Sequence, residues 1–363
     1  MLREKLTTAL VVALLASSCT AWTWGNRYDQ GPSTPAEETA GWLSTSASAF
    51  NTCRIAVDFG LWCHGENRFG EVGDGTGVAT DDFVRIGTDT WLDVNTTAAS
   101  TCGVKTDRTL WCWGVINDGT YPPDPADLVL SPQPRSNTTD WATVGGSQES
   151  LCGTKVDGSL WCWGANTTYQ LGDGTRDYRP DPVLISDARW ISVDSGYRAS
   201  CGVQNDHTLW CWGVDVSGET GQGPGPEVEY PVPTQVGSST DWREVSLADS
   251  YACATRIDNS LWCWGSLLFT NEIFAEIPTR VGADSAWRTV DTGPSSACGI
   301  QQDNSMWCWG KNDRGRVGDG TTDFQPEPVQ VGHGRTWIAV SLFWTVDALA
   351  LDSTTPGAGS ASN

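Results

Sequence analysis

The chain has 363 residues and a formal net charge of −22, with 22 lysines and arginines against 44 aspartates and glutamates. Direct binding of nucleic acid or of an anionic membrane relies on basic side chains that neutralise phosphate, so this charge argues against both as direct partners. Forty glycines and eighteen prolines without a collagen period are typical of many short strands joined by turns.

The first eighteen residues resemble an export signal. Arg3 and Lys5 precede an apolar run from Ala9 to Ala16, which is too short to cross a bilayer as a stable helix, and small residues follow. The run Ala16-Ser17-Ser18-Cys19 resembles a bacterial lipobox, although alanine stands where leucine is usual. We therefore predict a signal peptide over residues 1–18 and a lipid anchor on Cys19, with ordinary signal cleavage as the alternative.

Two halves of one repeat unit lie at opposite ends of the chain. Trp22-Thr23-Trp24-Gly25 repeats the end of the unit described below, with threonine in place of cysteine, and Trp337-Ile338-Ala339-Val340 repeats its beginning. Ala348 stands eleven residues after Trp337, where a cysteine is expected. We predict that Thr23 and Ala348 face each other and that strands from both termini complete one blade.

Between these ends, tryptophan and cysteine return at a period of about 50 residues, which is in the range of propeller blades. Each of six units has a lead tryptophan, a cysteine eleven residues later, a second cysteine ten residues after the first, and then Trp-Gly, or His64-Gly65 in the first unit. The lead tryptophans are Trp42, Trp91, Trp141, Trp190, Trp242 and Trp287. The cysteine pairs are Cys53/Cys63, Cys102/Cys112, Cys152/Cys162, Cys201/Cys211, Cys253/Cys263 and Cys298/Cys308.

Each unit is predicted to form four short strands, at residues 182–185, 190–193, 201–204 and 209–212 in the clearest unit. A tight turn built on aspartate makes the last two strands a hairpin. Opposed strand residues lie within bridging distance, whereas residues ten apart on a helix do not. We therefore predict six disulfides within blades and an extracytoplasmic location. The C-x2-4-C spacing of a structural zinc site is absent from these pairs.

Acidic, glycine-rich loops follow the hairpins at residues 73–76, 172–175 and 318–321. They lack the D-x-[DN]-x-[DN]-G series of a dedicated calcium loop, so we interpret them as turns and expect no cofactor. Residues 19–352 are thus predicted to form a single closed array of seven units. The small polar residues at 353–363 predict a disordered tail.

The pattern of W-x-x-V, then C-G or a small pair, then D-G-x-L-W-x-W-G-x-N and L-G-D-G-T resembles the regulator of chromosome condensation repeat and its exported bacterial branch. The resemblance covers about residues 21–352. It implies an all-β, seven-bladed β-propeller with four-stranded blades, the last closed by N- and C-terminal strands. The family includes a guanine nucleotide exchange factor, a plant ultraviolet photoreceptor and a secreted inhibitor of β-lactamases, which share a propeller face that holds another protein.

No catalytic constellation interrupts the repeat. His64, His207 and His333 lie in different units, the cysteines are used in pairs, and no nucleophile elbow occurs. We therefore predict a non-catalytic, monomeric scaffold or inhibitor that binds another protein. One alternative is exchange factor-like activity, which the even spacing without an inserted wedge and the acidic, exported character of the chain do not favour. The other is an envelope enzyme that uses surface carboxylates.

The loop between the lead-tryptophan strand and the first cysteine varies most between units, as expected of a binding surface. Several of these loops carry aromatic or basic residues of types enriched at protein interfaces. We predict that the partner contacts Phe50, Tyr197, Arg198, Tyr251, Phe343 and Trp344. The alternative is that these aromatics cap the propeller core.

Overall fold

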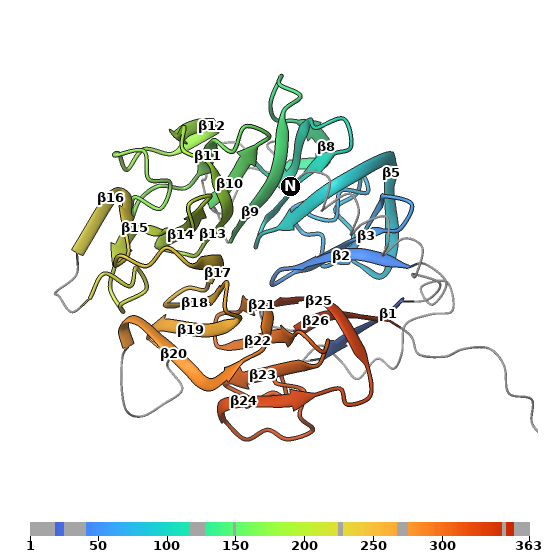
Figure 1. The fold of residues 1–363 in the computed structure, drawn as a ribbon. Helices are drawn as coiled ribbons and strands as arrows, with labels where there is room; N and C mark the ends of the chain where they lie inside the picture. The colour runs from blue at the N-terminus through green and yellow to red at the C-terminus, as the bar shows by residue number, and fades with distance from the viewer. Residues whose placement is uncertain are drawn as a thin grey trace, which may run out of the picture.

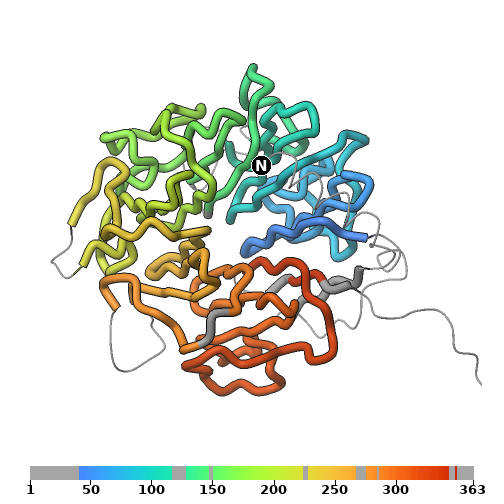
Figure 2. The backbone as a smooth tube through the Cα atoms, in the orientation of Figure 1, coloured from blue at the N-terminus to red at the C-terminus, as the bar shows by residue number. Residues whose placement is uncertain are grey.

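The computed structural model describes residues 19–24, 41–116, 128–147, 150–223, 228–266, 275–342 and 346–351. All regular secondary structure in these ranges is β-strand. The sheets follow one another in chain order around a central axis, and the earliest and latest parts of the ring lie side by side (Figure 1; Figure 2). Within these ranges, no helix has the length and apolar character needed to cross a bilayer.

Four sheets each consist of four antiparallel strands in chain order. They are β9 (Trp141–Ser147), β10 (Ser150–Lys155), β11 (Leu160–Gly164) and β12 (Arg179–Ser186); β13 (Trp190–Ser195), β14 (Ala199–Gln204), β15 (Leu209–Asp215) and β16 (Val228–Gln235); β17 (Trp242–Leu247), β18 (Tyr251–Arg256), β19 (Ser260–Gly265) and β20 (Ala275–Ser285); and β21 (Trp287–Thr292), β22 (Ser296–Gln301), β23 (Met306–Gly310) and β24 (Gln325–Val331). In each sheet the strand that begins with the lead tryptophan is innermost and the fourth strand lies at the rim (Figure 1).

The first two units share one seven-stranded sheet. Its strands are β2 (Trp42–Ala47), β3 (Asn51–Ala56), β4 (Gly60–Gly65), β5 (Thr80–Thr96), β6 (Ser100–Lys105), β7 (Leu110–Val115) and β8 (Leu128–Pro134). The 17-residue strand β5 pairs with β4 through residues 80–90 and with β6 from Trp91 onward. One continuous strand therefore ends the first unit and begins the second.

The remaining sheet joins the two ends of the described chain. β26 (Val346–Leu351) pairs on one side with β25 (Thr336–Leu342) and on the other with β1 (Cys19–Trp24), antiparallel in both cases. Thr23 lies opposite Asp347, whereas Ala348 lies opposite Trp22. The prediction that Thr23 faces Ala348 was therefore wrong by one residue.

The length of the connection between β25 and β26 explains this difference. In the β13–β14 pair, Asp194 lies opposite Cys201, eleven residues after Trp190. In the β25–β26 pair, Ser341 lies opposite Asp347, which is ten residues after Trp337. The turn is one residue shorter, so Asp347 occupies the register position that a cysteine holds in the other units.

A disulfide joins the second and third strands in each of the six units that contain cysteines. The opposed cysteines have Cα atoms between 4.0 and 4.1 Å apart, and the bonds are Cys53–Cys63, Cys102–Cys112, Cys152–Cys162, Cys201–Cys211, Cys253–Cys263 and Cys298–Cys308. These are the pairs that the spacing predicts. On the loop-entropy account, closing a ring of this size stabilises a protein by about 2.5 to 3 kcal/mol.

The hairpin turn between these strands is held by a short relay of side chains. Ser159 donates from its backbone amide and its hydroxyl to Asp157 Oδ1, at 2.9 and 2.7 Å, and Trp161 Nε1 donates to Ser159 Oγ at 3.0 Å. The hydrogen bonds from Ser159 lower the pKa of the Asp157 carboxyl. The same relay recurs at Asp107, Asp206, Asp258 and Asp303, which explains the aspartate two residues before a serine or threonine in these turns.

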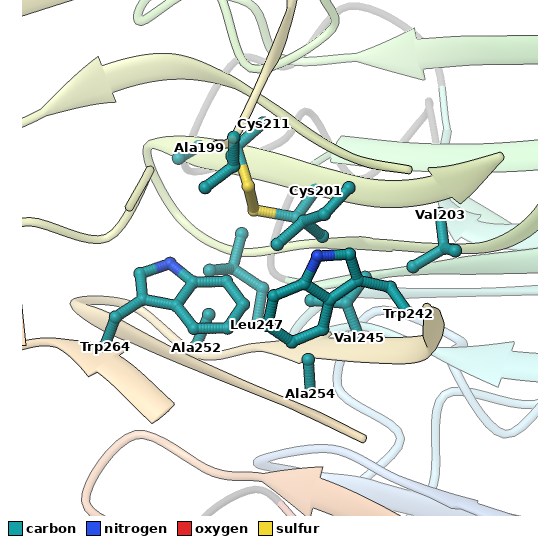
Figure 3. Close-up of a cluster of buried hydrophobic side chains, with 12 residues drawn as sticks. Ala199, Cys201, Val203, Cys211, Trp242, Val245, Leu247, Ala252, Ala254 and Trp264 are labelled. Atoms are coloured by element: carbon teal, nitrogen blue, oxygen red, sulfur yellow. A yellow bond between two sulfur atoms is a disulfide. The ribbon is translucent and has the colours of Figure 1, made fainter. Parts of the chain in front are cut away.

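The hydrophobic core lies between neighbouring sheets. Trp242 of β17 and Trp264 of β19 lie against the Cys201–Cys211 disulfide of the preceding sheet, together with Val203 (Figure 3). The two indole rings are 6.1 Å apart in an edge-on arrangement and are at most 1% exposed. Because these large side chains fill the wedge between two sheets, the tryptophan period in the sequence is a period of blade-to-blade contacts.

The tryptophan after the second cysteine also fixes the neighbouring sheet by a hydrogen bond. The Nε1 atoms of Trp113, Trp212 and Trp264 each donate to a backbone carbonyl of the preceding unit at 2.9 Å, those of Glu71, Gln170 and Glu219 respectively. A buried indole N–H thus finds a partner across the blade interface, where a phenylalanine would leave the carbonyl without this donor.

Candidate functional site

A cavity of about 70 Å³ lies where the ends of the innermost strands meet. Its wall includes residues from β2, β5, β9, β13, β17, β21 and β25, and the connections after β17 and β21 reach it through Ala248, Asp249 and Pro294. The polar side chains on the wall include Ser46, Asn95, Thr96, Asp194, Asp249, Asp291, Thr292 and Ser341. We call this end of the propeller the loop face, because the loops predicted to bind a partner begin here.

Three of the predicted contact residues have accessible side chains in these loops. Tyr197, between β13 and β14, is 50% exposed, and the guanidinium carbon of Arg198 lies 5.6 Å from its ring centroid. Arg198 and Phe50 are half-buried. The loop with Tyr197 packs closely on the next one, since a side chain at Gly196 would come within 2.4 Å of the Ala248 carbonyl oxygen.

Tyr251 does not lie on this surface. Its side chain is 1% exposed, and its hydroxyl donates toward the carbonyl oxygens of Gly293 and Ser296, at 2.9 and 2.8 Å. Burial raises its pKa well above the ordinary value for tyrosine. The prediction that Tyr251 contacts a partner was therefore wrong, because the first residue of β18 points into the contact with the next sheet.

The other predictions of special residues fall on parts of the chain that the structure describes only partly or not at all. Phe343 and Trp344 lie outside the described residues, as do the predicted signal peptide over residues 1–18 and the predicted tail over 353–363. Cys19 is the first residue of β1 and lies opposite Leu351 in the register. Its lipidation remains a prediction.

The sequence analysis missed a set of polar residues four positions after the lead tryptophans. In five places, such a side chain accepts a hydrogen bond from a backbone amide of the neighbouring innermost strand, at 2.6 to 3.0 Å: Ser46 from Thr96, Asp194 from Leu247, Ser246 from Thr292, Asp291 from Leu342 and Ser341 from Ala47. The innermost strands, including β5 from Trp91 onward, pair with another strand on one side only, so these amides have no strand partner. The neighbouring side chain supplies the missing acceptor.

Two of these acceptors are carboxyls that meet at one serine. Ser246 Oγ lies 3.3 Å from Asp194 Oδ2 and 3.1 Å from Asp291 Oδ1. Burial raises the pKa of Asp194 to about 6, and burial together with the charge of Asp194 raises that of Asp291 to about 7. Both residues lie on the cavity wall.

Other candidate chemical groups are used in local structure. His207 Nδ1 lies 2.8 Å from the Trp242 carbonyl oxygen, and the His64 ring packs at a tilt against Phe83 with centroids 4.3 Å apart. In the loop at residues 73–76, Asp74 accepts hydrogen bonds from Thr76 and from Asn67. Within the described ranges, no three or more histidine, cysteine, aspartate or glutamate side chains are grouped so that they could hold a metal ion.

Comparisons with known proteins agree with this architecture. The family model of the regulator of chromosome condensation (RCC1) repeat matches residues 157–203 and 303–342. A search of curated protein sequences finds no match.

Three similar solved structures have the same fold at low sequence identity. Prp20p of Saccharomyces cerevisiae has a TM-score of 0.79 and 14% identity, covering 95% of each chain. Human WBSCR16 has a TM-score of 0.78 and 13% identity, covering 93% of this chain and 99% of its own. Yeast RCC1 (Prp20) bound to Kap60 has a TM-score of 0.77 and 13% identity over 95% of this chain and 92% of its own. The chain therefore has the β-propeller fold of these structures and matches the regulator of chromosome condensation (RCC1) repeat at residues 157–203 and 303–342.

Proposed function

We propose that this protein is a non-catalytic scaffold or inhibitor that binds another protein through the loop face. The observation that supports this most is the cavity at the end of the innermost strands, which the connections after β17 and β21 reach, together with the exposed Tyr197 in the connection after β13. Tyrosine and arginine side chains are enriched at binding hot spots. Prp20p is described with its binding to Gsp1p and histones, and yeast RCC1 has been solved with Kap60, so propellers of this fold bind proteins.

The charge of the loop face favours a partner with lysine or arginine side chains. Asp194, Asp249 and Asp291 all lie on the cavity wall, and the whole chain is strongly acidic. Complementary charge mainly speeds association and selects among partners, so we expect binding to be faster at low salt. Exchange factor-like activity is the second candidate. It ranks below the scaffold because only the likeness to Prp20p supports it.

We also infer that the ring is closed and has seven blades, with the seven-stranded sheet counted as two that share β5. Three observations support closure. β1 pairs with β26, Ala47 N in β2 donates to Ser341 Oγ in β25 at 3.0 Å, and Trp42 packs in one cluster with Leu349.

Substitution of Tyr197 tests the proposed face. A partner would first be captured from the native envelope with the wild-type protein and identified. We expect Tyr197→Ala to raise its Kd by at least about tenfold, equivalent to about 1.4 kcal/mol, because truncating a hot-spot aromatic removes that much or more. The melting temperature should stay nearly unchanged, since half of this side chain is exposed.

Val232→Ala is the matched control, because Val232 is 51% exposed on the rim strand β16. It should leave the Kd unchanged in calorimetry. Weaker binding by Val232→Ala together with full affinity in Tyr197→Ala would move the binding surface from the loop face to the rim.

We further propose that the protein is exported and anchored by lipid on Cys19. Six disulfides fit an oxidising compartment, and the lipobox-like run ends at Cys19. Mass spectrometry of the mature protein should find Cys19 as a lipidated first residue, and Cys19→Ser should release the protein from the membrane fraction. A mature N-terminus at any other residue would refute the anchor.

A further inference from the structure

Asp194 and Asp291 both contact the hydroxyl of Ser246, and this hydroxyl cannot donate a hydrogen bond to two ionised carboxylates at once. Ser246 Oγ already accepts a hydrogen bond from Thr292 N at 3.0 Å, and a hydroxyl has only one proton to donate. It can therefore satisfy at most one of the two carboxylate oxygens at 3.1 and 3.3 Å, and Thr292 Oγ1 also lies 3.0 Å from Ser246 Oγ. The other contact is favourable only if that carboxyl carries a proton of its own.

The same three residues link four consecutive sheets. Asp194 is in β13, Ser246 in β17 and Asp291 in β21, and each carboxyl also accepts a backbone amide of a neighbouring sheet. Leu247 N donates to Asp194 Oδ2 at 2.9 Å, and Leu342 N of β25 donates to Asp291 Oδ2 at 2.6 Å. The protonation of this pair therefore bears directly on contacts between blades.

The groups that face this pair do not compensate its charge. Asp249 lies on the same cavity wall, and the hydroxyl of Tyr251 is close enough for Asp291 and Asp249 to raise its pKa. Glu244 lies two residues before Ser246 in β17, and its Oε1 accepts a hydrogen bond from Val290 N. The neighbouring strands β2 and β25 contribute the uncharged Ser46 and Ser341 to the cavity wall. In the described part of the chain, neither Asp194 nor Asp291 forms an ion pair with an arginine or lysine.

We propose that Asp194, Ser246 and Asp291 form a proton-sharing bridge that joins four sheets around the cavity, and that losing the shared proton near neutral pH weakens this joint. The native protein holds protons on this pair that the unfolded chain, with ordinary aspartates, releases near pH 4. Its contribution to stability is full below the unfolded pKa and is lost as pH rises through about 6 and 7.

Melting temperatures measured between pH 5 and 8.5 test the bridge. We expect the wild-type value to fall between about pH 5 and 7 and to level off above that, and Asp291→Asn, which keeps the shape and removes the charge, to reduce this fall by roughly 2 to 4 °C. Asp303→Asn is the control, because Asp303 lies in a hairpin turn after β22 of the same sheet, and hydrogen bonds from Ser305 lower its pKa. It should keep the wild-type slope. Glu219, whose pKa burial raises to about 7, adds a slope of its own, so each variant is compared with the wild type.

A double variant separates proton sharing from simple burial. Once Asp291 is neutral, the proton of Ser246 is free for Asp194, which then ionises more readily, so adding Asp194→Asn should change the slope little further. Two independently buried carboxyls would instead give additive changes. Additive slopes, or a wild-type slope retained in both single variants, would overturn the proposal. If Asp291→Asn does not fold, the pH dependence of the melting temperature of Asp194→Asn is compared with that of the wild type instead.

Discussion

A chain that begins at residue 25 should melt at a markedly lower temperature than one that begins at residue 19 and should aggregate. The shorter chain lacks β1, whose six residues all pair with β26. At a net value of about 1 kcal/mol for each hydrogen bond, loss of this ladder costs on the order of several kcal/mol. It also leaves β26 as an open edge that can pair with another molecule.

Calorimetry and light scattering of the two chains provide the measurement. Removing residues 353–363 instead is the control and should change neither. A peptide with the sequence of β1, Cys-Thr-Ala-Trp-Thr-Trp, should restore part of the lost stability, because it can add to the same edge. Equal melting temperatures for the chains that begin at 19 and 25 would show that the terminal strand does not close the ring.

Trp242→Ala should lower the free energy of unfolding by about 3 to 5 kcal/mol, the usual cost of removing a buried tryptophan. The indole is 1% exposed, contacts Trp264, and lies under the guanidinium of Arg256 at 4.2 Å from the ring centroid. The alanine would leave a void between the β13–β16 and β17–β20 sheets. Urea unfolding at one protein concentration gives the value directly.

Two further substitutions show whether the stability depends on filling the space between the two sheets or on any aromatic residue being present. Trp242→Phe keeps the aromatic packing and removes an indole N–H that has no hydrogen-bond partner in the described ranges, so the loss should be smaller. Tyr197→Ala removes an aromatic that is half exposed and should cost almost nothing. A loss below about 1 kcal/mol for Trp242→Ala would contradict the central role of the lead tryptophans in the core.

The repeat predicted the units, the hairpins and the disulfides because each depends on residues near one another in sequence. Trp242 and Cys253 mark buried positions, and Asp258 marks a turn, in any copy of the unit. The continuous strand β5 could not be predicted, since residues 85–90 look like a connection and become strand only by pairing with β4. The register opposite Thr23 depended on a single residue of turn length at the other end of the chain.

The site was harder to predict because it depends on contacts between units. Tyr251 and Tyr197 lie two positions apart in equivalent parts of their units, but only the first points into the next sheet. Asp194 and Asp291 resemble ordinary surface aspartates in the sequence. Their role follows from the amides of Leu247 and Leu342, which belong to blades about 50 residues away.

The amide-to-side-chain contacts of the innermost strands have a direction. In each of the five, the acceptor belongs to one blade and the donor to the blade that follows it around the ring. At these five junctions the acceptor therefore always lies on the flank that faces the next blade, and the donor on the flank that faces the preceding blade. Duplication or loss of a whole unit of about 50 residues would preserve this direction at the new junction. The direction of these contacts therefore places no constraint on the number of blades in the ring.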